Sequence, residues 1–267
     1  MRPILIACLL LTTSVPALSH QFWLEPDNAI VMPGERAIIH IFIGSDFKGE
    51  ELGNFPEMQQ TVDLFAGGES YNIPGRIGDI PAFKFRSELP GLHVLRYQSI
   101  ENVVTYDSYD LYLTFLKEAE REDLAAVHDA RGLPRDGITE VFIRYAKALI
   151  AVGEGTGADH FTGMPFELVA MDNPYQSDAD ALTFALLLDG KPAAEAALHL
   201  FIRKPDGTID TRIRLRSDGQ GLVEVPITEP GFYMLNAIHI LPATPQMETL
   251  QKANWQSLWA SITFAVK

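Results

Sequence analysis

The residues best suited to chemistry stand where an apolar leader meets the string HQFWLEP, which begins at His20. Small residues at Ala17 and Ser19 have the spacing that signal peptidase reads, so the favoured cut leaves His20 as the first residue of the mature chain. A free α-amino group and an imidazole on one residue can close a chelate ring on a metal ion. The amine gives up its proton readily, because its pKa is only about 8. The sequence therefore predicts a transition-metal chelate at His20.

Two other readings of this junction stay open. The string VPA offers a competing cut before Leu18, which would leave His20 two residues inside the chain and abolish the chelate. In the second reading the cut falls before His20 without chemical consequence, and Phe22 to Leu24 simply open a β-strand.

The other histidines are spread along the chain, and none has the i, i+4 or two-residue spacing of a local zinc site. Any shared site must therefore be assembled by the fold. The seven histidines are His20, His40, His93, His128, His160, His199 and His239. His93 falls on an apolar strand face, and His239 lies near the end of a strand, where ligands are often presented. For each internal histidine the alternative is a partly buried structural role.

Two further patterns have both a functional and a structural reading. Arg212, Arg214 and Arg216 alternate with apolar residues, which predicts three cations on one strand face and hence an anion site or a solvated surface. Trp255 and Trp259 are four residues apart and suit either saccharide stacking or core packing. The sequence contains no nucleophile elbow, P-loop or dinucleotide fingerprint, which lowers the expectation of a hydrolase or a nucleotide enzyme.

Composition limits the compartment and the partners. Residues 1–19 have a short basic start and an apolar run too short to span a bilayer, so we interpret them as a cleaved signal peptide and expect a periplasmic protein. Cleavage removes the only cysteine, so no disulfide is expected. The formal charge is −14, and loss of Arg2 makes it 20 − 35 = −15, which disfavours nucleic-acid binding. No later stretch is long and apolar enough for a membrane span.

The pattern of strands and turns predicts a mainly β protein with two immunoglobulin-like β-sandwich domains. Short β-runs fill residues 20–115, the N-terminal sandwich, and return in residues 158–267, the C-terminal sandwich. Between them, residues 116–157 show a period of about 3.6, first over Lys117 to Arg131 and then from Asp136 through Tyr145 and Leu149. This middle segment is predicted to be a helical hairpin inserted between the domains.

Many phrases in order resemble one family. They are HQFWLEP, GLHVLRYQS, RGLP, RYAKALI, PFELVAMDNPY, LLLDGKP, GFYMLNAIHI and WQSLWASITF. Together they resemble the domain-of-unknown-function family 4198, secreted bacterial proteins related to NikM-like periplasmic components of nickel and cobalt uptake. The resemblance implies a periplasmic β-sandwich protein that handles a transition metal, with a membrane transport component as a partner. The histidines of the family's motifs fall on His20, His93 and His239.

These observations lead to one main functional hypothesis and two alternatives. The main hypothesis is a periplasmic metal-binding protein whose metal ligands are His20, His93 and His239, and a site with nitrogen donors suits copper or nickel. One alternative is a copper-dependent oxidative enzyme. The other is a metal-free module that binds carbohydrate or peptide through its tryptophans.

Overall fold

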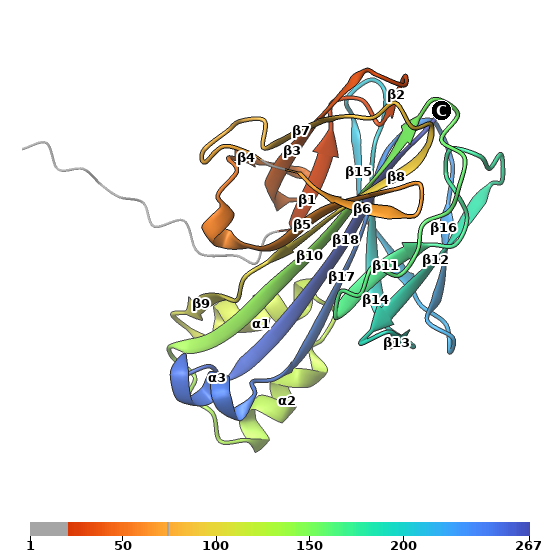
Figure 1. Ribbon diagram of the computed structural model, residues 1–267. Coiled ribbons are helices and arrows are strands. Elements are labelled where there is room, and N and C mark those ends of the chain that lie inside the picture. The colour runs from red at the N-terminus through yellow and green to blue at the C-terminus, as the bar shows by residue number, and fades with distance from the viewer. Residues whose placement is uncertain (1–20, 74) are drawn as a thin grey trace, which may run out of the picture.

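Three β-sheets build the fold, and the largest runs through the whole molecule (Figure 1). The computed structural model describes residues 21–73 and 75–267; the predicted signal peptide and His20 lie outside the described residues. The prediction of a mainly β chain is confirmed, because 51% of the residues are in strands and 11% in helices. The sheets therefore define the layers.

The central sheet has ten strands. Its main path, in spatial order, is β15 (Ile209–Arg216), β14 (Ala197–Arg203), β17 (Gly231–Pro242), β18 (Trp255–Val266), β10 (Ile138–Val152), β8 (Gly91–Ser99), β5 (Gln59–Ala66) and β6 (Glu69–Asn72). Two short strands, β2 (Ile30–Val31) and β9 (Asn102–Tyr106), also pair with β10. β10 runs parallel to β18 and antiparallel to β8 and β9. Both halves of the chain thus contribute strands to one sheet.

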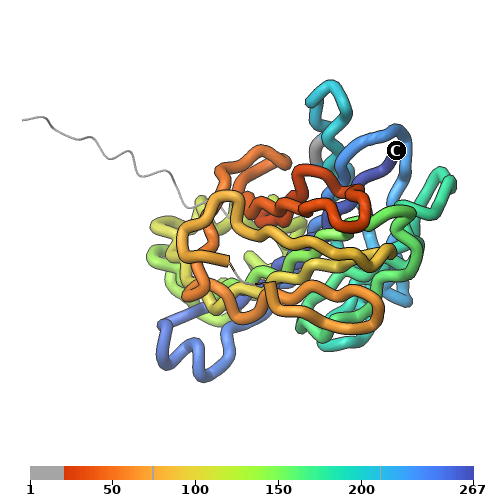
Figure 2. Tube along the Cα trace, turned by 45° about the horizontal axis from the view of Figure 1, so that its top comes forward, coloured from red at the N-terminus to blue at the C-terminus, as the bar shows by residue number. Residues whose placement is uncertain are grey.

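Two smaller sheets cover this central sheet. The N-terminal sheet consists of β1 (Gln21–Pro26), β3 (Arg36–Ser45), β4 (Lys48–Leu52) and β7 (Phe83–Arg86). The C-terminal sheet consists of β11 (Phe166–Ala170), β12 (Ala181–Leu188), β13 (Lys191–Pro192) and β16 (Leu222–Pro226). Figure 2 shows β1 and β3 of the N-terminal sheet, in red, lying along the yellow and green strands of the central sheet.

The two faces of the central sheet have different coverings. On the face called here the N-face, Ile150 and Leu95 pack against the N-terminal sheet, and Trp259 packs against helices. On the opposite face, the C-face, Leu149 and Leu258 pack against the C-terminal sheet. Side chains alternate between the two faces along every strand. The strands in the middle of the central sheet, such as β10 and β18, are therefore buried on both faces.

Helices occupy the part of the N-face that the N-terminal sheet leaves free. They are α1 (Tyr109–Glu118) and α2 (Asp123–Ala130), with η1 (Pro56–Met58) and α3 (Pro245–Leu250) in loops elsewhere. The Ser108 hydroxyl accepts a hydrogen bond from the Leu111 amide and caps α1. Residues 108–115, predicted to be a strand, are therefore mostly helix, because Tyr112, Phe115 and Leu116 form a buried helical stripe over the sheet.

The prediction that the hairpin contains a second helix is wrong. The segment with Tyr145 and Leu149 is β10, a strand of 15 residues in the middle of the central sheet. Its apolar residues match helical spacing only because nearly every position is apolar, and a strand buried on both faces shows no period of two. Two separate sandwiches joined by a helical insertion are therefore not found, since the sandwiches share β10, β17 and β18.

Candidate functional site

The first predicted metal ligand in the described part, His93, is fully buried on the N-face of β8. Its Nδ1 lies 3.2 Å from the Gly91 carbonyl oxygen, so Nδ1 carries the proton and donates it. Its Nε2 is 2.8 Å from the Ser87 Oγ and accepts the hydroxyl hydrogen. Burial lowers the pKa of His93, and Phe85 stacks on the ring at 6.0 Å. Both ring nitrogens are therefore used within the N-terminal half.

His239 lies on the other face of the same sheet. It pairs with Leu258, whose side chain belongs to the core under the C-terminal sheet, and its ring is 5.8 Å from that of Phe166. Burial, followed by the nearby Arg121, lowers the pKa of His239. The imidazole is thus held as a neutral, half-buried group on the C-face.

The structure does not bring His93 and His239 together. His93 pairs with Ile150 on the N-face, whereas His239 is on the C-face and three strands away. The register also separates them by seven residues along the strands, which corresponds to about 23 Å. A single metal site that joins His20, His93 and His239 does not fit this geometry. Within the described ranges, no group of three His, Cys, Asp or Glu side chains could hold a metal ion.

Two other histidines hold structure together. His128, buried on α2, accepts a hydrogen bond from the Trp255 indole at 3.1 Å and donates one to the Pro134 carbonyl at 2.9 Å, which fixes the helix to the sheet. His40 lies between Asp27 and Glu51, at 2.5 and 2.6 Å from their carboxylate oxygens. The two carboxylates contact the two different nitrogens of the imidazole. These three side chains therefore form salt bridges and do not surround a common metal ion.

Strand β1 enters the fold at a closely fixed point. Gln21, its first residue, pairs with Gly44, and its buried side chain accepts a hydrogen bond of 2.9 Å from the Asp46 amide. The Phe22 carbonyl accepts a hydrogen bond of 2.8 Å from the Ser261 hydroxyl on β18. Gln21 therefore lies next to the β3–β4 turn, and Phe22 lies against the N-face.

Acidic side chains and arginines extend from this entry point across the edge of the N-face. Arg212 binds Asp46 at 2.7 Å and Glu118 at 3.6 Å. Glu120, just after α1, binds His199 at 2.9 Å and Arg214 at 3.1 Å. The predicted arginine face of β15 thus pairs with carboxylates of the β3–β4 turn and of the α1 end. The oxygen and imidazole groups of this network are those of Asp46, Glu118, Glu120 and His199.

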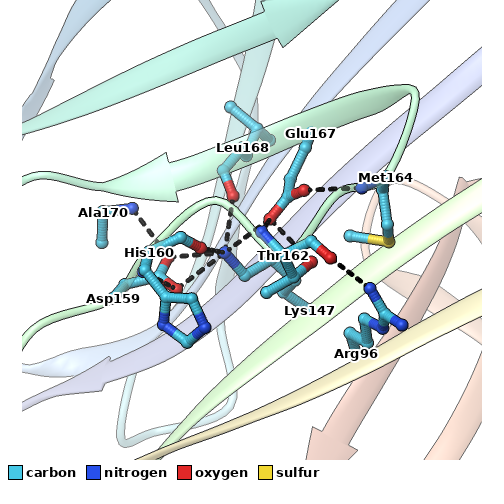
Figure 3. A network of polar contacts seen from close by, with 9 residues as sticks. All are labelled: Arg96, Lys147, Asp159, His160, Thr162, Met164, Glu167, Leu168 and Ala170. Atoms are coloured by element: carbon cyan, nitrogen blue, oxygen red, sulfur yellow. Dashed lines mark hydrogen bonds and ion pairs between the residues drawn. The ribbon is translucent and has the colours of Figure 1, made fainter. Parts of the chain in front are cut away.

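A buried lysine on β10 binds the loop before the C-terminal sheet (Figure 3). Lys147 is fully buried, and its Nζ lies 2.7 Å from Asp159 and 3.1 Å from Glu167. It also donates to the carbonyls of His160 and Leu168. The carboxylates in turn accept backbone amides of the loop, including those of Thr162, Met164 and Ala170. Every N–H donor of the ammonium is therefore used, and the cluster fixes the loop before the C-terminal sheet to β10.

A second buried carboxylate, Glu140 on β10, lies under the helices. Tyr106 donates to its Oε2 at 2.6 Å, and Ser257 donates to its Oε1. The Trp259 indole donates to the Ser257 Oγ at 2.8 Å. Burial raises the pKa of Glu140 to about 7, although these hydrogen bonds oppose the shift.

The tryptophan pair is part of the core. Trp255 and Trp259 pack on the helices over the N-face and are 0% and 5% exposed. A saccharide cannot stack on rings that the protein already covers. The carbohydrate-binding alternative therefore loses the residues on which it depended.

Sequence reasoning missed Glu140, Arg144 and Lys147, all on β10. The signal was present, because three charged side chains stand within the apolar run ITEVFIRYAKALIAV. A charged residue in a strand buried on both faces needs a partner or a ligand.

The fold and these clusters define a class: a mainly β protein built on one long central sheet, with polar clusters where the covering layers meet. Among the described residues, no helix is long and apolar enough to cross a bilayer. The chain belongs to the family described as a domain of unknown function (DUF4198), whose family model matches residues 17–241. This confirms the family predicted from the motifs.

No curated protein matches the chain. Among solved structures, it is similar to a point mutant of Salmonella α2-macroglobulin, with 16% identity over 98% of this chain and a TM-score of 0.22. It is similar to the Salmonella protein reacted with methylamine at 14% identity over 94% of this chain, TM-score 0.24. The native E. coli α2-macroglobulin gives 13% over 93%, TM-score 0.22. The chain spans 16%, 15% and 14% of the length of those proteins. The TM-scores are too low to support a conclusion about fold or function.

Proposed function

We propose that this chain is a periplasmic protein that binds copper or nickel through the amine and imidazole of His20, at the start of its mature form. The observation that carries the proposal is the anchoring of Gln21, whose main chain is paired with Gly44 and whose side chain is bonded to Asp46. Because Gln21 is anchored, a chelate formed by the residue before it would lose less conformational freedom on binding than one on a free tail.

The remaining donors come from the entry point rather than from His93 and His239. Asp46, whose amide donates to Gln21, would supply a carboxylate. His199, paired with Glu120 in the ion-pair network of β15 that also includes Asp46, would supply an imidazole. A mixed nitrogen and oxygen donor set suits Cu(II) or Ni(II), and copper binds more tightly by the Irving–Williams order. In this proposal the metal is cargo that the protein carries, as the resemblance of its motifs to components of nickel and cobalt uptake implies.

Metal titration of the protein purified from the periplasm with its own leader tests the proposal. Chain starting at His20 is expected to bind one Cu(II) or Ni(II) tightly. His20→Ala, and a chain with one alanine inserted before His20, should each lose at least tenfold in affinity, about 1.4 kcal/mol. The insertion is the sharper variant, because it keeps the imidazole and removes the amine from the chelate ring.

The matched control is His239→Ala, which removes an imidazole on the C-face far from β1. It should leave metal affinity unchanged, whereas His199→Gln should weaken binding. Equal affinity for the inserted chain and the unmodified chain would reject the terminal chelate. A large loss in His239→Ala would return that residue to the site.

A further inference from the structure

Arg144 is a half-buried cation that has no ion-pair partner among the residues that the structure describes. It lies on the N-face of β10, partly buried, and its Nε has neither solvent contact nor a hydrogen-bond partner. In the described part of the chain its guanidinium makes no ion pair and no side-chain hydrogen bond. Two rings flank it: the Cζ lies 4.5 Å from the centroid of Phe142 and 5.7 Å from that of Phe22.

The acidic residue on the same strand face does not serve as its partner. Glu140 is four residues away on β10, which is about 13 Å along a strand, and its oxygens accept from Tyr106 and Ser257. Burial lowers the pKa of Arg144 to about 10, and Tyr97 and Glu140 offset this only in part. Removing part of a charge from water without a counter-ion is costly, so its presence points to a ligand.

A cavity of about 40 Å³ opens at the guanidinium, between the N-terminal sheet and strands β5 and β8. Most of its lining is apolar, from Phe22, Ile41, Leu52, Phe55 and Tyr97. Gln59, Ser99 and Asn102 add uncharged polar groups, and Arg144 is the one charged residue among the lining residues. A space of this size holds about three water molecules, or one small ion in their place.

We propose that this cavity is an anion site in which Arg144 binds a small carboxylate of the size of formate or acetate. A guanidinium presents parallel N–H donors that match the two oxygens of a planar carboxylate, and the charge-assisted pair is strongest where water is excluded. The apolar walls accept the hydrogen or methyl end of the ligand. A tetrahedral dianion fits less well, because it is larger and the cavity offers one cation.

Thermal unfolding in the presence of different anions tests the site. The melting temperature of the unmodified protein should rise saturably with formate or acetate, beyond the effect of sulfate at equal ionic strength. Benzoate should give no such rise, because its ring exceeds the cavity. Arg144→Met should melt at a higher temperature than the unmodified protein without anion, because it removes an unpaired charge, and should show no carboxylate dependence.

Arg135→Met is the matched control, since Arg135 is exposed and paired with Asp129 on α2, and it should keep the carboxylate response. If Arg144→Met does not fold, ¹³C-acetate titrated against the unmodified protein gives the answer by NMR line broadening, which sulfate should leave in place and formate should reverse. A carboxylate response equal to that of sulfate, or one that persists in Arg144→Met, would mean that the rings alone accommodate the guanidinium and would overturn the proposal.

Discussion

The Tyr106 hydroxyl donates a hydrogen bond of 2.6 Å to the Oε2 of Glu140, a carboxyl that is 1% exposed beneath α1. Burial raises the pKa of Glu140 from 4.5 to about 7. Between these two values the folded state binds more protons than the unfolded state, so this group makes stability fall as pH rises from about 4.5 to 7. The contribution amounts to about 3 kcal/mol.

Glu140→Gln should therefore flatten the pH dependence of stability in this range. The amide keeps the size of the side chain and cannot ionise. Urea unfolding at pH 5 and pH 8 measures the effect, with Glu154→Gln, an exposed carboxylate, as the control. An unchanged difference between the two pH values in Glu140→Gln would contradict the assignment.

Lys147 offers a second stability prediction. Lys147→Met should cost about 3 to 5 kcal/mol, because Asp159 and Glu167 would remain buried without a cation. Adding Glu167→Gln should recover part of the loss, since one uncompensated charge is removed. Denaturant unfolding measures both, and Lys191→Met, at an exposed lysine on β13, serves as the control. A cost below about 1 kcal/mol would show that the ion pairs of Lys147 contribute little to stability.

His40 should also make stability fall as pH rises, but over a higher pH range than Glu140 does. Its burial lowers its pKa, but the hydrogen bonds and charges of Glu51 and Asp27 outweigh burial, and the net pKa is raised above 6.5. The stabilisation is thus fully present below pH 6.5 and is lost as pH rises through the raised value. His40→Gln should remove this step from a plot of melting temperature against pH, whereas His160→Gln, at an exposed loop position, should not.

β10 should be among the last segments to open. It pairs on both sides and is buried on both faces, so its amides should exchange with solvent only on global unfolding. Leu149→Ala should cost about 2 to 5 kcal/mol, because it leaves a cavity under the C-terminal sheet. Hydrogen exchange resolved by residue tests both expectations. Fast exchange over 142–150 would mean that the central sheet is not continuous there.

Much of the strand pattern could be predicted from the sequence. Gly91–Ser99 and Ile209–Arg216 are strands within the two ranges predicted to hold short β-runs, because turn residues limit them and their side chains alternate. β10 could not be predicted in this way, since burial on both faces removes the alternation that distinguishes a strand from a helix.

The candidate site was harder to predict for a different reason. A strand's own pattern tells which residues share its face, but which face meets which layer depends on pairing between distant segments. His93 and His239 lie in strands that β10 and β18 separate, and this pairing puts them on opposite faces. No local pattern carries that information. The charges of Glu140, Arg144 and Lys147 within an apolar run did carry a signal for buried polar clusters.

The central claim is that the mature chain begins at His20 and holds a metal there. Native mass spectrometry of the protein isolated from the periplasm tests it most directly, because one spectrum gives both the first residue and the bound metal. We predict the mass of a chain of 267 − 19 = 248 residues with one copper or nickel ion. A chain that begins at Leu18 and carries the same metal, or one that begins at His20 and carries none after copper and nickel are supplied, would contradict the account.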